Sequence, residues 1–209
     1  MTDSLSPAET QQLQHLLGQG YARAAASFAT LAGQPVRSEA VWLSLAQSFD
    51  LAQLESLDAG PLTVLTTHLQ GELTGKSLLI LSQAECETLW QMQGFDKAYG
   101  AQHPLWQPLL LEVDNILSAA VITHFANVLG KKMYGGVPTL HEGRRPQLLA
   151  ALAENTDQPD TESCFLFSNA RLVFENNALM NPYFIWRLPQ TFLRELSTRT
   201  AVQPQIANN

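Results

Sequence analysis

Two polar side chains that could do chemistry lie close together in the sequence, at Glu112 and Asn115. They are three positions apart (115 minus 112), so on a helix they lie on one face, about one turn apart. A carboxylate accepts hydrogen bonds and can pair with a cation, and an amide both donates and accepts. Glu112 and Asn115 are therefore the candidate site residues.

The residues around this pair indicate a surface rather than a core. At 100° per residue, one stripe of the predicted helix carries only polar or small side chains, namely Glu112, Asn115, Ala119, Thr123, Ala126 and Asn127. Burying such polar groups without partners would cost roughly 1 to 3 kcal/mol each. A solvent-facing stripe would usually be richer in Lys, Glu and Arg. The stripe therefore favours a surface that another protein approaches closely.

A purely structural interpretation fits the same two residues. Glu112 and Asn115 fall in the first turns of the predicted helix, where a carboxylate interacts favourably with the helix dipole. On physical grounds alone this interpretation is preferred, so the residues by themselves leave both alternatives open.

The composition is that of a folded protein without the features of a nucleic-acid binder. The chain has 209 residues, 45% of them hydrophobic and 15% charged, which is enough apolar material to offset the entropy cost of folding. A net charge of -7 and a pI near 5.1 argue against nucleic-acid binding, which needs clustered cations. The five histidines show no metal-ligand spacing, so no metal site is expected.

Cysteine usage and hydropathy predict a cytoplasmic protein. Cys86 and Cys164 fall in a predicted helix and a predicted strand, so each is expected to be a small buried side chain in a reducing compartment. A disulfide between them stays possible. No apolar run is judged long enough to span a bilayer, and residues 1–9 lack the regions of a signal peptide. No membrane association is expected.

The first half of the chain predicts a long helix, a strand, a hairpin and a short helix. The long helix at 6–31 opens with Ser6, Pro7 and Glu9, which form a capping box with proline at the first helical position. Gly33 ends it. The other elements are a strand at 36–45, hairpin strands at 61–70 and 74–82, and a helix at 84–92.

The second half repeats that order. Its long helix is predicted to begin after Pro104 and Pro108 and to run to about Lys132, before a Gly-Gly-Val-Pro turn at 135–138. The remaining predictions are a short helix at 147–154, a loop at 155–162, a strand pair at 164–175 and 182–188, a helix at 190–198 and a frayed tail at 200–209.

The shared order predicts one domain over 1–209, built from repeats at 6–97 and 104–199. An offset of 97 (112 minus 15) lays the two long helices over one another and matches, for example, Phe28 with Phe125. An offset of 107 (188 minus 81) matches Leu81 with Leu188. The fold class that follows is α/β, of the α+β type.

The segment EVDNILSAAVITHFANVLG at 112–130, followed by Pro138, resembles the signature of the CheC/CheX/FliY group of chemotaxis phosphatases. That signature has Glu, two residues, Asn, and a proline well downstream. Asn115 and Pro138 are 23 positions apart (138 minus 115), which fits the pattern. The resemblance implies a CheC-like domain with six or so strands in one mixed or antiparallel sheet and two long helices on one face.

The resemblance also implies a reaction, the hydrolysis of the aspartyl phosphate on a CheY-like receiver domain. In that group the Asn orients the attacking water and the Glu pairs with a receiver lysine, which assigns these roles to Asn115 and Glu112. Phosphoryl transfer depends on positioning and charge stabilisation more than on a strong base, so an amide can suffice. The Mg2+ would belong to the receiver, and the chain would need no cofactor of its own.

The first repeat carries His15 and Gly18 at the positions equivalent to the pair, which predicts one site per chain. The alternative is a catalytically inactive CheC-like module that only binds, for instance as an adaptor in a chemotaxis or flagellar-switch complex. The resemblance also allows a homodimer.

Overall fold

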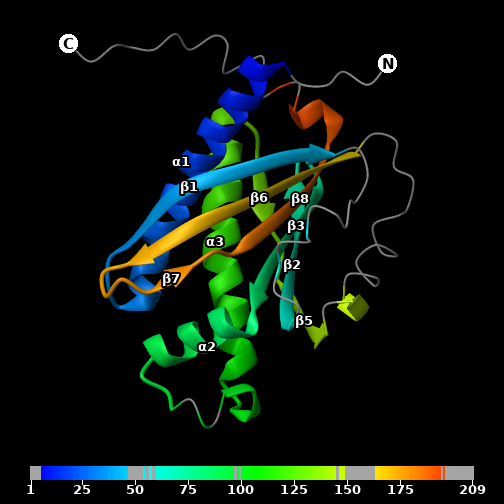
Figure 1. The fold of residues 1–209 in the computed structure, drawn as a ribbon. Coiled ribbons are helices and arrows are strands. Elements are labelled where there is room, and N and C mark those ends of the chain that lie inside the picture. The colour runs from blue at the N-terminus through cyan, green and yellow to red at the C-terminus, as the bar shows by residue number, and fades with distance from the viewer. Residues whose placement is uncertain are drawn as a thin grey trace, which may run out of the picture.

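The computed structural model describes residues 6–46, 54, 57, 60–96, 98, 100–144, 146–148, 163–193 and 195. These residues form one curled antiparallel sheet with two long helices on one face (Figure 1). The strands are β1 (Val36–Ala46), β2 (Pro61–Gly71), β3 (Gly75–Ser82), β4 (Met133–Gly135), β5 (Thr139–Arg144), β6 (Ser163–Phe174), β7 (Leu179–Met180) and β8 (Tyr183–Pro189). Their order is β1-β6-β8-β3-β2-β4, with β5 also paired to β2 and β7 to β6. The predicted fold class is confirmed.

The first long helix has its predicted ends, whereas the second begins before Pro108 rather than after it and ends earlier than predicted. In α1 (Pro7–Ala32), Ser6 is the N-cap in a capping box with Glu9, and Gly33 follows the last turn at φ 64°. In α3 (Trp106–Leu129), Gly130 takes the same left-handed conformation at φ 61°. Because glycine adopts this conformation without strain, α3 stops at Leu129 rather than near Lys132.

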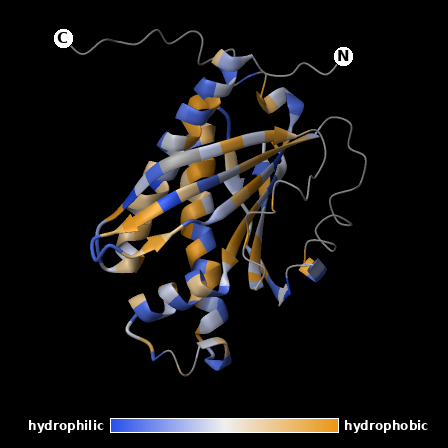
Figure 2. Cartoon of the chain, in the orientation of Figure 1, coloured by the Kyte–Doolittle hydropathy of each residue, from blue (hydrophilic) through white to orange (hydrophobic). Residues whose placement is uncertain are grey.

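The main core lies between these helices and the sheet. Figure 1 shows α1 and α3 side by side on one face of the sheet, and their apolar side chains share one buried cluster with the inner faces of the strands. Phe28 of α1 meets Phe174 edge to face, and Phe125 of α3 meets Trp186 in the same way. Figure 2 shows hydrophobic residues along much of α3 and alternating with polar ones along the strands.

Most predicted elements are present. The strands predicted at 36–45, 61–70, 74–82, 164–175 and 182–188 are β1, β2, β3, β6 and β8, and the helix predicted at 84–92 is α2 (Gln83–Met92). The segment after α3 differs, because β4 and β5 flank the glycine-rich turn and add to the edge of β2. The loop at 155–162 and the tail at 200–209 lie outside the described residues, as does most of the helix at 147–154.

Strands from the two halves of the chain occupy equivalent positions on either side of the centre of the sheet. The hairpins β2–β3 and β6–β8 meet at the centre through β3 and β8. β1 flanks the second hairpin, and β4 and β5 flank the first. Each half of the chain thus contributes the outer strand that pairs with the other half's hairpin. Two copies of one unit would produce this arrangement.

Candidate functional site

The candidate pair lies on α3, which is attached to the rest of the fold at both ends. Near the start, Trp106 Nε1 donates a hydrogen bond to Glu142 Oε1 of β5 at 2.8 Å. Just after the end, Lys131 Nζ lies 2.6 Å from Glu195 Oε1. The Trp106 ring is itself buried, so the helix that carries the pair begins on a fixed support.

One face of α3 is open to solvent. Glu112 and Asn115 are both exposed, as are Ala119, Thr123 and Asn127 further along, while Ala126 is half-buried. Within the described part of the chain, neither Glu112 nor Asn115 forms a hydrogen bond or ion pair. Both side chains are therefore available to a partner that approaches this face.

The helix dipole gives a poor account of Glu112. The first helical residue is Trp106, so Glu112 is the seventh and Asn115 the tenth. The dipole acts on charges mainly within the first turn, which ends before either residue. The structural interpretation of the pair thus loses its main physical support.

A buried polar cluster lies on the other side of the same helix turns. Asp114 is fully buried, and its Oδ2 accepts a hydrogen bond from Thr67 Oγ1 of β2 at 2.6 Å. Its Oδ1 accepts a hydrogen bond from Ser118 Oγ at 2.7 Å, and Ser77 of β3 lies 3.4 Å from Ser118 through their Oγ atoms. Burial raises the pKa of Asp114, and the bonds from Thr67 and Ser118 oppose this shift.

Sequence reasoning missed this cluster. The signal available was Asp114 and Ser118, two polar residues four positions apart in an otherwise apolar helix face. Their partners Thr67 and Ser77 come from the first hairpin, 47 and 41 positions away. They lie next to each other under α3 because β2 and β3 pair in the sheet.

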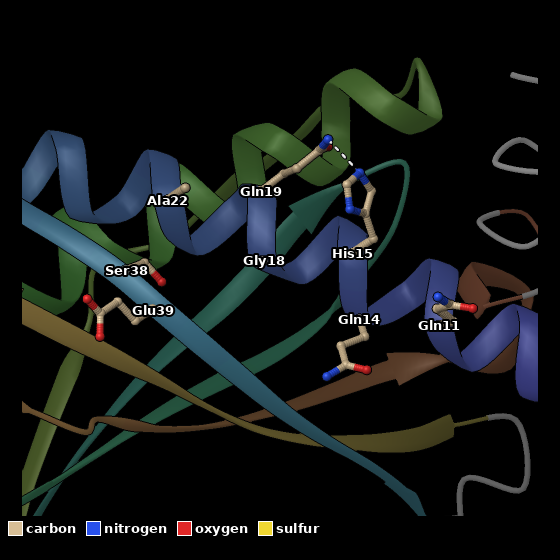
Figure 3. Close-up of a pocket in the computed structure, with 8 residues that line it drawn as sticks. All are labelled: Gln11, Gln14, His15, Gly18, Gln19, Ala22, Ser38 and Glu39. Carbon is tan, nitrogen blue, oxygen red and sulfur yellow. Dashed lines mark hydrogen bonds between the residues drawn. The ribbon is translucent and has the colours of Figure 1, made fainter. Parts of the chain in front are cut away.

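The equivalent face of α1 has a different character. His15 is exposed and Gly18 half-buried, and the ring of His15 forms a 3.0 Å hydrogen bond with the Gln19 amide. An open hollow of about 480 Å³ lies here, lined by α1 together with Ser38 and Glu39 of β1. Figure 3 shows the residues that line it. No carboxylate–amide pair occupies this face of α1.

The two cysteines are buried and free, and they contribute nothing to the candidate site. Burial raises the pKa of Cys86 to about 12 and that of Cys164 to about 11, so neither is a reactive thiolate near neutral pH. Among the described residues, no group of His, Cys, Asp and Glu side chains could hold a metal ion.

α3 differs from expectation in one property. It is long and apolar enough to cross a bilayer by length and composition, although the sequence was expected to hold no such run. However, 56% of its most apolar window is buried inside the fold. Its apolar character is thus explained by packing against α1 and the sheet.

Known structures share this arrangement, although no family model and no curated protein matches the sequence. FliY from Thermotoga maritima matches with a TM-score of 0.67 at 13% identity, over 96% of this chain and 98% of that chain. CheX from Vibrio vulnificus matches with a TM-score of 0.52 at 11% identity, over 83% and 98%. The fold is that of the CheC/CheX/FliY group.

A chain of the FliG–FliM complex from H. pylori also matches, with a TM-score of 0.56 at 9% identity, over 93% of this chain and 100% of that chain. The same fold thus occurs in FliY, in CheX and in a chain of the FliG–FliM complex. At these identities the similarity is one of fold, and any role of Glu112 and Asn115 has to be argued from the site.

Proposed function

We propose that the chain is a phosphatase that hydrolyses the aspartyl phosphate of a CheY-like receiver domain. The observation that carries this proposal is the exposure of Glu112 and Asn115 on one face of α3, without partners among the described residues. Small neighbours such as Ala119 would let a second protein approach the helix closely. The fold shared with CheX and FliY supports the same assignment.

The chemistry requires little of the chain beyond placement. Asn115 would hold a water molecule through its amide, in line with the phosphorus atom. The water oxygen forms the new P–O bond while the bond from phosphorus to the receiver's carboxylate oxygen breaks, and the water proton leaves with the phosphate or to solvent. Positioning and charge stabilisation dominate such reactions. The Mg2+ that neutralises the phosphoryl charge would be held by the receiver.

Glu112 would serve to dock the receiver rather than to take part in the bond changes. Its carboxylate lies one turn before Asn115 and would pair with a receiver lysine beside the phosphorylated aspartate. Exposed pairs contribute modestly, on the order of 1 kcal/mol or less. The loss of Glu112 should therefore affect KM more than kcat.

The test is phosphate release from a phosphorylated receiver in the presence of the wild type and single variants. Asn115→Ala is expected to lower kcat by roughly 100-fold or more, as the loss of one stabilising group does in other active sites. Glu112→Ala is expected to raise KM by roughly two- to fivefold. Gln107→Ala is the matched control, because Gln107 is an exposed amide near the start of the same helix and lies outside the stripe. It should stay within about twofold of wild type.

The second candidate is a binding module without catalysis, and the match to a chain of the FliG–FliM complex favours it. Under this alternative, phosphate release would be equally slow with and without the wild-type protein, while a receiver or another partner would still bind. Binding measured by calorimetry beside the release assay separates the two functions.

A further inference from the structure

A carboxyl group is buried directly behind the candidate pair, where an apolar side chain would be expected. Asp114 has no exposed surface, whereas the next residue, Asn115, is exposed. The surrounding core-facing residues of α3 are apolar: Leu110, Val113, Leu117 and Val121. No Lys, Arg or His in the described ranges pairs with Asp114. A buried carboxyl without a cation is costly, so a gain in stability does not explain its presence.

Hydrogen bonds can fix the height of α3 along its axis and its rotation about that axis, which apolar contacts alone cannot do. Apolar surfaces pack without strong directional preference, whereas hydrogen bonds restrict both distance and angle. Asp114 makes such bonds to Thr67 of β2 and to Ser118 one turn later, and Ser118 contacts Ser77 of β3. Two neighbouring strands are thereby connected to one helix turn.

We infer that Asp114 is a positioning residue for Glu112 and Asn115, which fixes the rotation and height of α3 through its bond to Thr67. The inference rests on the proposed phosphatase function. Successive helix residues are 100° apart, so the direction of the Asp114 side chain determines that of Asn115. A small rotation of the helix would move the Asn115 amide away from the line of attack.

The partner hydroxyl is itself held in place. Thr67 is β-branched and has few rotamers, and its methyl group packs on Gly135 of β4. A Cβ atom on Gly135 would lie 2.9 Å from Thr67 Cγ2, closer than such atoms approach. The absence of a side chain at Gly135 therefore leaves room for the Thr67 rotamer that reaches Asp114.

The two site residues should respond differently when this contact is lost. Glu112 has a long side chain that can still reach a receiver lysine after a small helix rotation. Asn115 has a short side chain and must keep a water molecule within hydrogen-bond distance. Loss of positioning should therefore lower kcat and leave KM nearly unchanged.

The fold supplies a matched control under the other long helix. The hydroxyl of Tyr21 on α1 lies 2.6 Å from Ser168 Oγ of β6, and Trp186 Nε1 donates to the same hydroxyl at 3.2 Å. The offset of 97 places Tyr21 over Ser118 (118 minus 21). This contact is equally buried, and it also joins a helix to the sheet, but α1 carries no candidate pair.

The strand register makes the control closer still. Thr67 pairs with Ser77 across the first hairpin, and Ser168 pairs with Phe184 across the second. The offset of 107 places Ser77 over Phe184 (184 minus 77), so Thr67 and Ser168 occupy equivalent positions. Thr67→Val and Ser168→Ala thus each remove one hydroxyl beneath one long helix.

The experiment measures kcat and KM for phosphate release, together with the thermal unfolding midpoint, in wild type, Thr67→Val, Asp114→Asn, Ser168→Ala and Tyr21→Phe. Thr67→Val and Asp114→Asn are expected to lower kcat at least fivefold, with KM within twofold of wild type. Ser168→Ala and Tyr21→Phe are expected to lower the midpoint but to keep kcat within twofold.

Two results would overturn the inference while the proposed function stands. The first is an active wild type together with a folded Thr67→Val variant whose kcat is unchanged. The second is a fall in kcat that is equally large in Thr67→Val and Ser168→Ala. A wild type that does not accelerate phosphate release overturns the proposed function itself, and the inference with it.

Discussion

Thr67 Oγ1 of β2 lies 2.6 Å from Oδ2 of Asp114 on α3, in a fully buried contact between residues 47 positions apart. This polar contact joins the second long helix to the sheet. Because Asp114 precedes Asn115, this contact relates the interior of the protein directly to its exposed candidate site.

Stability should depend on pH through Asp114. Burial raises its pKa above the ordinary value of 3.8. The folded state therefore holds the carboxyl proton of Asp114 more tightly than the unfolded state does. The resulting contribution to stability is full below pH 3.8 and is lost as pH rises through the raised pKa. Wild type should therefore lose stability relative to Asp114→Asn as pH rises. Urea unfolding from about pH 4 to about pH 8 measures this difference, and the opposite slope would contradict it.

His124 should give a pH dependence of the opposite sign. It is 4% exposed between the long helices, and its Nε2 has no hydrogen-bond partner among the described residues. Burial and the nearby charge of Arg23 lower its pKa below the ordinary value of 6.5. Its contribution is present above pH 6.5 and is lost as pH falls. His124→Leu should flatten the dependence of the unfolding free energy on pH between about 7 and about 5. An unchanged slope would show that other groups cause it.

Gly135→Ala should destabilise the protein by about 1 to 3 kcal/mol, because the added methyl group overlaps Thr67. Gly136→Ala is the matched control. A Cβ atom there would lie 3.2 Å from Nε2 of Gln70, the end of a long, exposed side chain that can move aside. Denaturant unfolding compares the two variants, and equal losses would contradict the role of the Thr67 contact.

A second site should be obtainable on α1. In His15→Glu with Gly18→Asn, the first repeat would carry the same residue types at the same spacing as Glu112 and Asn115. Replacing glycine within a helix also favours the helical state. If the pair alone suffices, phosphate release per chain should rise by about twofold, since distant sites act independently. An unchanged rate in a folded variant would show that the surroundings on α3 are also required.

Local signals in the sequence predicted much of this structure. The capping box at Ser6 and the glycine at Gly33 set both ends of α1, and the alternating strands gave two hairpins in the right places. These features depend on neighbouring residues, so a single sequence contains them. The same holds for the exposed stripe on α3, which follows from helical geometry.

Long-range pairing could not be predicted in this way. β1 pairs with β6 from the far end of the chain, and β5 joins β2 although its sequence resembles a turn followed by polar residues. The partner of Asp114 depends on that pairing, because Thr67 reaches the helix only from a correctly placed β2. The buried half of the candidate site therefore requires the three-dimensional structure.

The absence of packing around Glu112 and Asn115 has a consequence for how such a domain changes over generations. Neither side chain supports the core, so mutational drift can replace both without penalty to folding. The first half of the chain, with His15 and Gly18, shows a stable helix that lacks the pair. The candidate pair is therefore not required for the fold, and similarly shaped proteins can keep or lose it without losing their structure.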